Sequence, residues 1–116
     1  MLQPIPVFYD SINRNAITII PKKPFFDWLN AIDPKSPITE VEEDTIYLVR
    51  ERDTNEDTEK WLKRNFDKIF QNELNDWYTD EQRWPQKRTF ILFQEWFEYK
   101  ICSLILDLEA TRVTKD

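Results

Sequence analysis

Three carboxylates of this chain stand beside aromatic residues, where they could perform acid–base chemistry. Glu95 and Glu98 flank an aromatic pair, and Asp27 precedes Trp28. A carboxylic acid that loses hydration next to apolar rings has a raised pKa and can act as a general acid. Two such groups are the machinery of glycosidases. Surface glutamates on ordinary helices also show this spacing, so the three residues are candidates for an acid–base site and not a signature of one.

The densest aromatic region lies between residues 77 and 99. Tryptophan and tyrosine favour interfaces because one end of the ring system is apolar and the other can hydrogen-bond. The candidate binding surface consists of Trp77, Tyr78, Trp84 and Trp96. Because Trp84 precedes Pro85 in a connection and not on a periodic face, we expect it to be the most exposed of the four. The alternative interpretation is that these rings pack between helices in the core.

The chain has no glycine and no histidine. At an average usage of ~7%, about 8 glycines are expected in a chain of this length. Their absence excludes phosphate-cradling loops, and the absence of histidine excludes Ser-His and Cys-His catalysis and ordinary zinc sites. The acidic segment 40–44 lacks the spacing and the glycine of a calcium loop. We therefore expect no metal and no cofactor, and we expect the lone Cys102 to be an inert thiol in the core.

The bulk composition indicates one acidic domain over residues 1–116. The net charge is -6, and 41% of the residues are hydrophobic. Residues 1–12 form an N-terminal extension or an edge strand, and residues 110–116 form a polar tail. Negative charge disfavours nucleic acid and anionic membranes and fits a partner protein with a basic surface. The N-terminus lacks the features of a signal peptide, so we expect a cytoplasmic location.

Hydrophobic periodicity predicts an α+β fold. The β-branched run 16–20 and the segment 45–49 are strands, residues 24–32 form a short helix, and a helix of about twenty residues follows Thr54. Thr89 caps a last helix that carries Phe90, Phe93, Phe97 and Ile101 on one face. Residues 101–108 then either form a third strand, which we favour, or continue this helix.

These elements give the order β-α-β-α-α-β. We expect a small three- to four-stranded sheet with two or three helices packed on one face. Without glycine, any left-handed backbone must fall on residues such as asparagine. Asn75 is the best candidate for such a residue, at the end of the long helix.

Four segments of the chain resemble small uncharacterised bacterial proteins. The segments are Asn13–Leu29, Trp77–Thr89, Phe93–Phe97 and Leu106–Leu108. The resemblance runs from about residue 12 to residue 108. It implies a bacterial, cytosolic, single-domain protein of unknown function, and it carries over no activity and no site residue.

The leading hypothesis for function is a non-enzymatic protein–protein interaction module that uses the aromatic-rich surface. The alternative is a small-molecule binder or a carboxylate-based enzyme with an aromatic-lined pocket, in which a largely buried carboxylate lies beside tryptophan rings. The protein is a monomer or a homodimer. In the dimer hypothesis the surplus aromatic rings close a two-fold interface.

Overall fold

A computed structural model describes residues 8–115, so residues 1–7 of the expected N-terminal extension and residue 116 of the expected tail lie outside the described part. In chain order the elements are β1 (Arg14–Pro21), α1 (Lys23–Ile32), β2 (Thr45–Arg50), α2 (Asn55–Asn75), the 3-10 turn η1 (Glu81–Arg83), α3 (Phe90–Trp96) and β3 (Phe97–Cys102). Over these described residues the fold is α+β, with three helices and an antiparallel sheet of three strands, not four. None of the described helices is long and apolar enough to cross a membrane.

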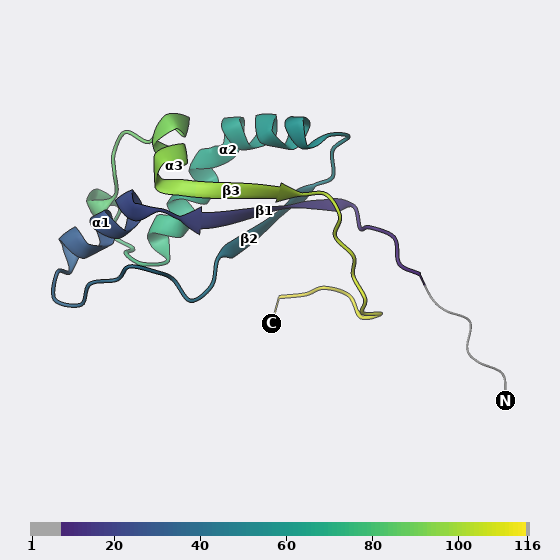
Figure 1. Cartoon of the computed structure of the whole chain (residues 1–116), viewed down its shortest axis with the longest axis horizontal. Helices are drawn as coiled ribbons and strands as arrows, with labels where there is room; N and C mark the ends of the chain where they lie inside the picture. The colour runs from purple at the N-terminus through teal and green to yellow at the C-terminus, as the bar shows by residue number, and fades with distance from the viewer. Residues whose placement is uncertain (1–7, 116) are drawn as a thin grey trace.

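The sheet is built around β1, which pairs antiparallel with both neighbours in the order β2-β1-β3 (Figure 1). Ile17 lies opposite Tyr47 on β2 and Ile101 on β3. Side chains alternate across a strand, so this row and its alternate neighbours form one face of the sheet. Ile17 and Ile19 on this inner face have 0% exposure. The predicted strands 16–20 and 45–49 are both confirmed, each slightly longer than expected.

The inner face packs under α2 and α3, and α1 follows β1 at one end of the sheet (Figure 1). Side-chain hydrogen bonds join α2 to every strand: Asn15 with Thr58, Tyr47 with Glu73, and Tyr99 with Glu59. The buried apolar core consists of Ile17, Ile19, Phe25, Leu29, Val49, Leu62, Ile69, Phe70, Leu74, Trp84, Phe93 and Phe97. The long helix therefore holds the three strands in place, and one face of the sheet stays free of helices.

The helix starts follow the expected capping chemistry. The hydroxyl of Thr54 accepts a hydrogen bond from the backbone N–H of Asp57 at 3.1 Å, and Thr89 does the same for Leu92 at 3.1 Å. These bonds satisfy backbone donors that have no partner inside the helix. Pro24 lies in the first turn of α1, where its missing N–H costs nothing.

The last helix is shorter than predicted, and the third strand begins earlier. α3 ends at Trp96, so the expectation that Phe97 and Ile101 continue its apolar face is wrong. β3 covers residues 97–102, not 101–108. The i, i+4 spacing of Phe97 and Ile101 suits a helix, but the same residues alternate with Glu98 and Lys100 as in a strand. Pairing along the free edge of β1 decides between the two, because it satisfies the backbone of both strands.

Beyond Cys102 the chain leaves the sheet. Residues 103–108 form no strand, and one isolated bridge joins Leu106 to Ser11. The N–H of Ile12 donates to the carbonyl of Ile105 at 2.7 Å. Cys102 is exposed, so its expected burial in the core is wrong. The prediction followed the general tendency of free cysteines to be buried, whereas Cys102 lies on the helix-free face of the sheet.

The backbone turns without left-handed residues. No residue between 8 and 115 has a positive φ angle, so the left-handed cap expected at Asn75 is wrong. Instead Asn75 is helical, and the N–H groups of Trp77 and Tyr78 both donate to the carbonyl of Leu74. Asp80 and Asp107 accept hydrogen bonds from N–H groups two residues further on, so the aspartate side chains stabilise turns that need no positive φ angle.

The buried pair between β1 and α2 gives a stability prediction. Asn15 and Thr58 have 0% exposure, and the Asn15 amide donates to the Thr58 hydroxyl at 2.9 Å. We expect Thr58→Val to lower the free energy of unfolding by about 1–3 kcal/mol, because the buried amide loses its acceptor. Urea unfolding measures this. Replacing both residues with valine removes the stranded amide and should cost less than the single change; a greater cost for the double variant would contradict this explanation.

Candidate functional site

The four candidate aromatic residues do not form one exposed surface. Trp84 has 7% exposure and belongs to the core, so the expectation that it is the most exposed of the set is wrong. Tyr78 and Trp96 are partly buried against the core, and both rings contact Trp28, with centroids 5.7 and 6.1 Å away. Trp77 is the exposed member, with 39% exposure. The structure therefore leaves Trp77 as the candidate recognition residue of the set.

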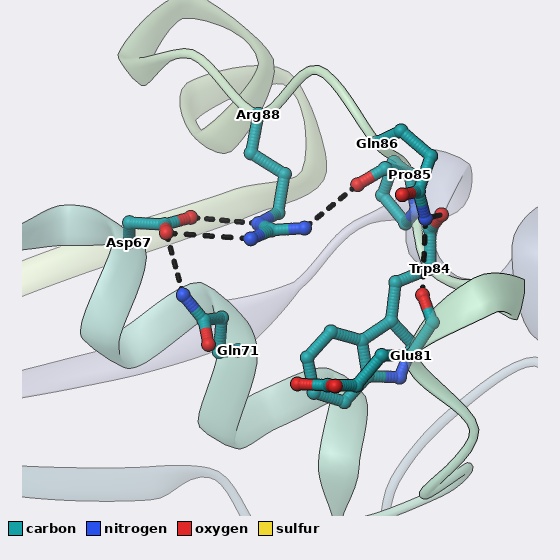
Figure 2. Close-up of polar contacts among 7 residues, drawn as sticks. All are labelled: Asp67, Gln71, Glu81, Trp84, Pro85, Gln86 and Arg88. Atoms are coloured by element: carbon teal, nitrogen blue, oxygen red, sulfur yellow. Dashed lines mark hydrogen bonds and ion pairs between the residues drawn. The ribbon is translucent and has the colours of Figure 1, made fainter.

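Trp84 is buried because the connection between α2 and α3 is fixed by hydrogen bonds. Its indole N–H donates to the carbonyl of Tyr78 at 2.8 Å. The guanidinium of Arg88 lies 5.9 Å from the Trp84 ring and pairs with Asp67 of α2 at 2.7 Å (Figure 2). Arg88 also donates to the carbonyl of Pro85 at 2.9 Å. The Arg88–Asp67 pair thus fastens the connection to α2, and Trp84 joins the core although local sequence places it in a loop.

The three candidate acid–base residues are all exposed. On α1, the Asp27 carboxylate forms an ion pair with Lys23, with Nζ 2.9 Å from Oδ2. Glu95 lies on α3 and Glu98 on β3, so the two are not a helical i, i+3 pair. None of the three is a largely buried carboxylate beside tryptophan, which is the arrangement that the enzyme hypothesis requires.

A different set of carboxylates surrounds a pocket of about 460 Å³ between the 38–45 segment and the end of α2. Its acidic lining residues are Glu40, Glu42, Glu43, Glu73 and Asp76, and its apolar lining residues are Pro21, Ile38, Val41 and Trp77. Thr45 completes the lining, which contains no lysine or arginine. The volume is within the ~300–1,000 Å³ typical of ligand sites.

The pocket wall formed by the 38–45 segment is attached to α1. The Asn30 side chain donates to the carbonyl of Ile38 at 2.8 Å and accepts from its N–H at 2.8 Å. This two-way amide contact fixes the start of the segment, so Ile38 and Val41 are held facing the end of α2. The opposite wall is rigid because Glu73 and Asp76 lie on or directly after a long helix.

Glu73 is the buried carboxylate of the pocket, with 6% exposure. Burial raises the pKa of Glu73, an effect that the hydrogen bond from Tyr47 opposes. The Tyr47 hydroxyl donates to Glu73 Oε2 at 2.5 Å and accepts from the Asn72 side chain at 2.8 Å. Burial and the neighbouring Glu73 carboxylate also raise the pKa of Tyr47, so Tyr47 stays a neutral donor.

The end of α2 adds to the negative potential of this pocket. The carbonyl end of a helix carries a partial negative charge, which basic residues usually balance. The last turn of α2 has no basic residue, and acidic Glu73 and Asp76 stand there instead. The helix end and the five carboxylates therefore both make the electrostatic potential of the pocket negative, and the pocket favours a cation.

Sequence reasoning proposed Trp77 as a binding residue, but it considered the acidic segment only as an unsuitable calcium loop, and it missed Glu73. The signal was present in the sequence, because Glu73 follows Ile69 by four residues and precedes Trp77 by four. It therefore lies on the apolar face of a helix, where an unpaired carboxylate is unusual. Tyr47 had no comparable signal, since its partners come from an element about 25 residues later.

No family model, curated protein or solved structure matches this chain. Within residues 8–115 the structure also contains no group of three or more carboxylate or cysteine side chains arranged to hold a metal ion. The pocket is therefore interpreted from its own geometry and charge.

Glu73 gives a prediction for the pH dependence of stability. Its pKa is raised above the ordinary 4.5, so the folded state binds more protons than the unfolded state between 4.5 and the raised value. Stability should fall as pH rises through this window. Glu73→Gln lacks this titration, so we expect its stability relative to wild type to increase in denaturant titrations as the pH rises from 4.5 through the raised pKa of Glu73. The exposed Glu42→Gln is the control, and an equal increase there would contradict the role of burial.

The ion pair between Arg88 and Asp67 gives a second prediction, of opposite sign. The hydrogen bond from Arg88 lowers the pKa of Asp67, so this stabilisation is present above the ordinary value of 3.8 and is lost as pH falls through the lowered pKa. We expect Arg88→Ala to reduce the free energy of unfolding by about 1–2 kcal/mol at neutral pH, since the pair is partly exposed. The loss should shrink in acid, and a loss independent of pH would assign the effect to packing on Trp84.

Proposed function

We propose that the protein is a bacterial cytosolic, non-enzymatic binding module whose acidic pocket receives a cationic side chain of a partner protein. The observation that carries this proposal is the pocket lining: five carboxylates and the exposed indole of Trp77, without a lysine or arginine. An arginine or lysine side chain suits this chemistry because its charge is balanced by the carboxylates and its stem packs on the apolar wall.

Trp77 gives this pocket an orienting surface. A cation over an indole face gains about 0.5–2 kcal/mol, and the guanidinium of arginine also stacks on the ring. The same geometry occurs within the protein, where the Arg52 guanidinium lies 5.5 Å from the centre of the Trp61 ring. The carboxylates attract the cation over a distance of about one Debye length. At contact, the indole favours a planar cation or one carried on an aliphatic chain. The net charge of -6 supports approach by a basic partner.

A second candidate function is the binding of a small organic amine in the same pocket. The observation that favours it is the burial of Glu73, because a carboxylate with 6% exposure is better reached by a small ligand than by a protein surface. Such a ligand would stabilise the folded state, and an added diamine would raise the Tm of wild type in proportion to the logarithm of its concentration.

Affinity purification from the native host at low salt tests the main proposal. We expect Trp77→Ala and the double change Glu42→Lys with Glu43→Lys to lose the captured partner, because the first removes the indole and the second reverses the charge of the rim. The matched control is Asp53→Lys with Glu95→Lys, two exposed positions outside the pocket, which makes the same change in net charge. Capture should persist in this control and weaken as salt is raised.

Retention of the partner by both pocket variants would refute the proposal. If no protein is captured but a diamine raises the Tm of wild type and not of the pocket variants, the second function is the correct one. Far-UV circular dichroism of each variant verifies that the fold is intact.

A further inference from the structure

The outer face of the sheet is apolar and uncovered by any helix. Ile46 and Leu48 on β2 point away from α2 and have 61% and 52% exposure. In the register Leu48 lies opposite Ala16, and Ala16 lies opposite Cys102 on β3, so one apolar row crosses all three strands, with Leu48 and Cys102 exposed and Ala16 between them at 8% exposure. Antiparallel sheets commonly leave one face to solvent, but that face is then usually polar. An exposed apolar face of this kind marks an interaction surface.

The same chain carries a second exposed apolar feature, which we term the arm: residues 8–12 and 103–109. The two segments leave one end of the sheet together (Figure 1) and are joined by the Ser11–Leu106 bridge. The arm exposes Phe8 at 88%, Leu104 at 76% and Leu108 at 64%. Exposure of large apolar side chains to water is unfavourable. A pair of extended segments with few backbone contacts is at best marginally stable alone, so the arm would be stabilised by burying these side chains.

The charges on the outer face and on the arm are complementary. Arg14 and Arg50 lie directly opposite each other in the register, on the outer face that also carries Lys100 and one carboxylate, Glu98. Like charges in directly opposite positions are destabilising. Among residues 8–115 the ion pairs involve other side chains, so none of these three cations has an acidic partner within the described part of the chain. The arm supplies three carboxylates: Asp10, Asp107 and Glu109.

We propose that the chain forms a two-fold dimer in which the arm of each copy covers the outer sheet face of the other. One chain carries both halves of the contact, an extended apolar and acidic arm and an open apolar and basic face. In a two-fold dimer the arm–face contact forms twice, so neither copy has a free arm or a free face and the assembly does not extend further. The arrangement places Leu104 and Leu108 of one copy over the row of Leu48, Ala16 and Cys102 of its partner.

Concentration-dependent mass is the first test, by light scattering and sedimentation of the full chain. We expect wild type to reach twice 14.2 kDa as concentration rises. Leu48→Glu should weaken association at least about tenfold, because it places a carboxylate in an apolar contact. Ile91→Glu is the matched control, since Ile91 has 69% exposure on α3, outside the proposed contact, and should still dimerise. A wild type that stays monomeric from about 1 μM to 1 mM overturns the proposal.

Cys102 provides a reporter without labelling, because it is the single cysteine and lies on the proposed contact face. Its reaction rate with a thiol reagent should fall as wild type is concentrated and should stay high in Leu48→Glu. Protection that is independent of concentration in a monomer means that the arm folds onto its own sheet, which also overturns the proposal.

A charge exchange tests whether arm and face come from different copies. Arg50→Glu changes the face, and the pair Asp107→Lys with Glu109→Lys changes the arm. Each variant alone should associate about tenfold more weakly than wild type. In an equimolar mixture both contacts regain opposite charges, so dimers should return. A mixture that associates no better than the separate variants refutes the arm-on-face arrangement, and dimerisation that neither variant affects shows that the copies meet elsewhere.

Discussion

The central strand β1 hydrogen-bonds along both edges, to β2 on one side and to β3 on the other. This double pairing decides which side chains face the helices, because a shift of one residue would turn every side chain to the opposite face. It also removes Phe97 from the helix to which its spacing would assign it, since β3 must start there to reach the end of β1. The burial of the inner face, the position of α2 and the exposure of the outer face all follow from this register.

The register also explains how a carboxylate comes to be buried at the pocket. Tyr47 faces inward because its neighbours Ile46 and Leu48 face outward, and it meets Glu73 near the end of α2. Burial of a charge and acidic residues at a helix carboxyl end both reduce stability. Here the buried carboxylate and the acidic helix end lie at the same pocket. They make its potential negative at a cost in stability, a combination that is common at functional sites.

Local sequence was sufficient for the elements with local causes. The β-branched runs marked β1 and β2, and threonine side chains marked the starts of α2 and α3. The errors at Trp84, Cys102 and the start of β3 depend on residues far away in the sequence, whereas the left-handed cap expected at Asn75 is a local error, because nearby backbone hydrogen bonds end α2 without a positive φ angle. Trp84 joins the core on a connection that the Arg88–Asp67 pair fastens to α2, and Cys102 is exposed because no helix covers the outer face. In the candidate site, the acidic segment and Trp77 were visible in the sequence, whereas their convergence with Glu73 required the fold.

The chain turns at every connection between residues 8 and 115 without a positive φ angle. This feature affects the unfolded state as much as the folded one. A residue other than glycine reduces the number of conformations available to the unfolded chain. Where that residue fits the native geometry, the free energy of unfolding rises by about 0.4–1 kcal/mol. About 8 glycines are expected at average usage, so the entropy lost on folding is smaller by several kcal/mol, comparable with the ~5–15 kcal/mol net stability of a domain. A stiffer unfolded ensemble is therefore one source of the stability with which this small domain offsets a buried carboxylate and an uncovered sheet.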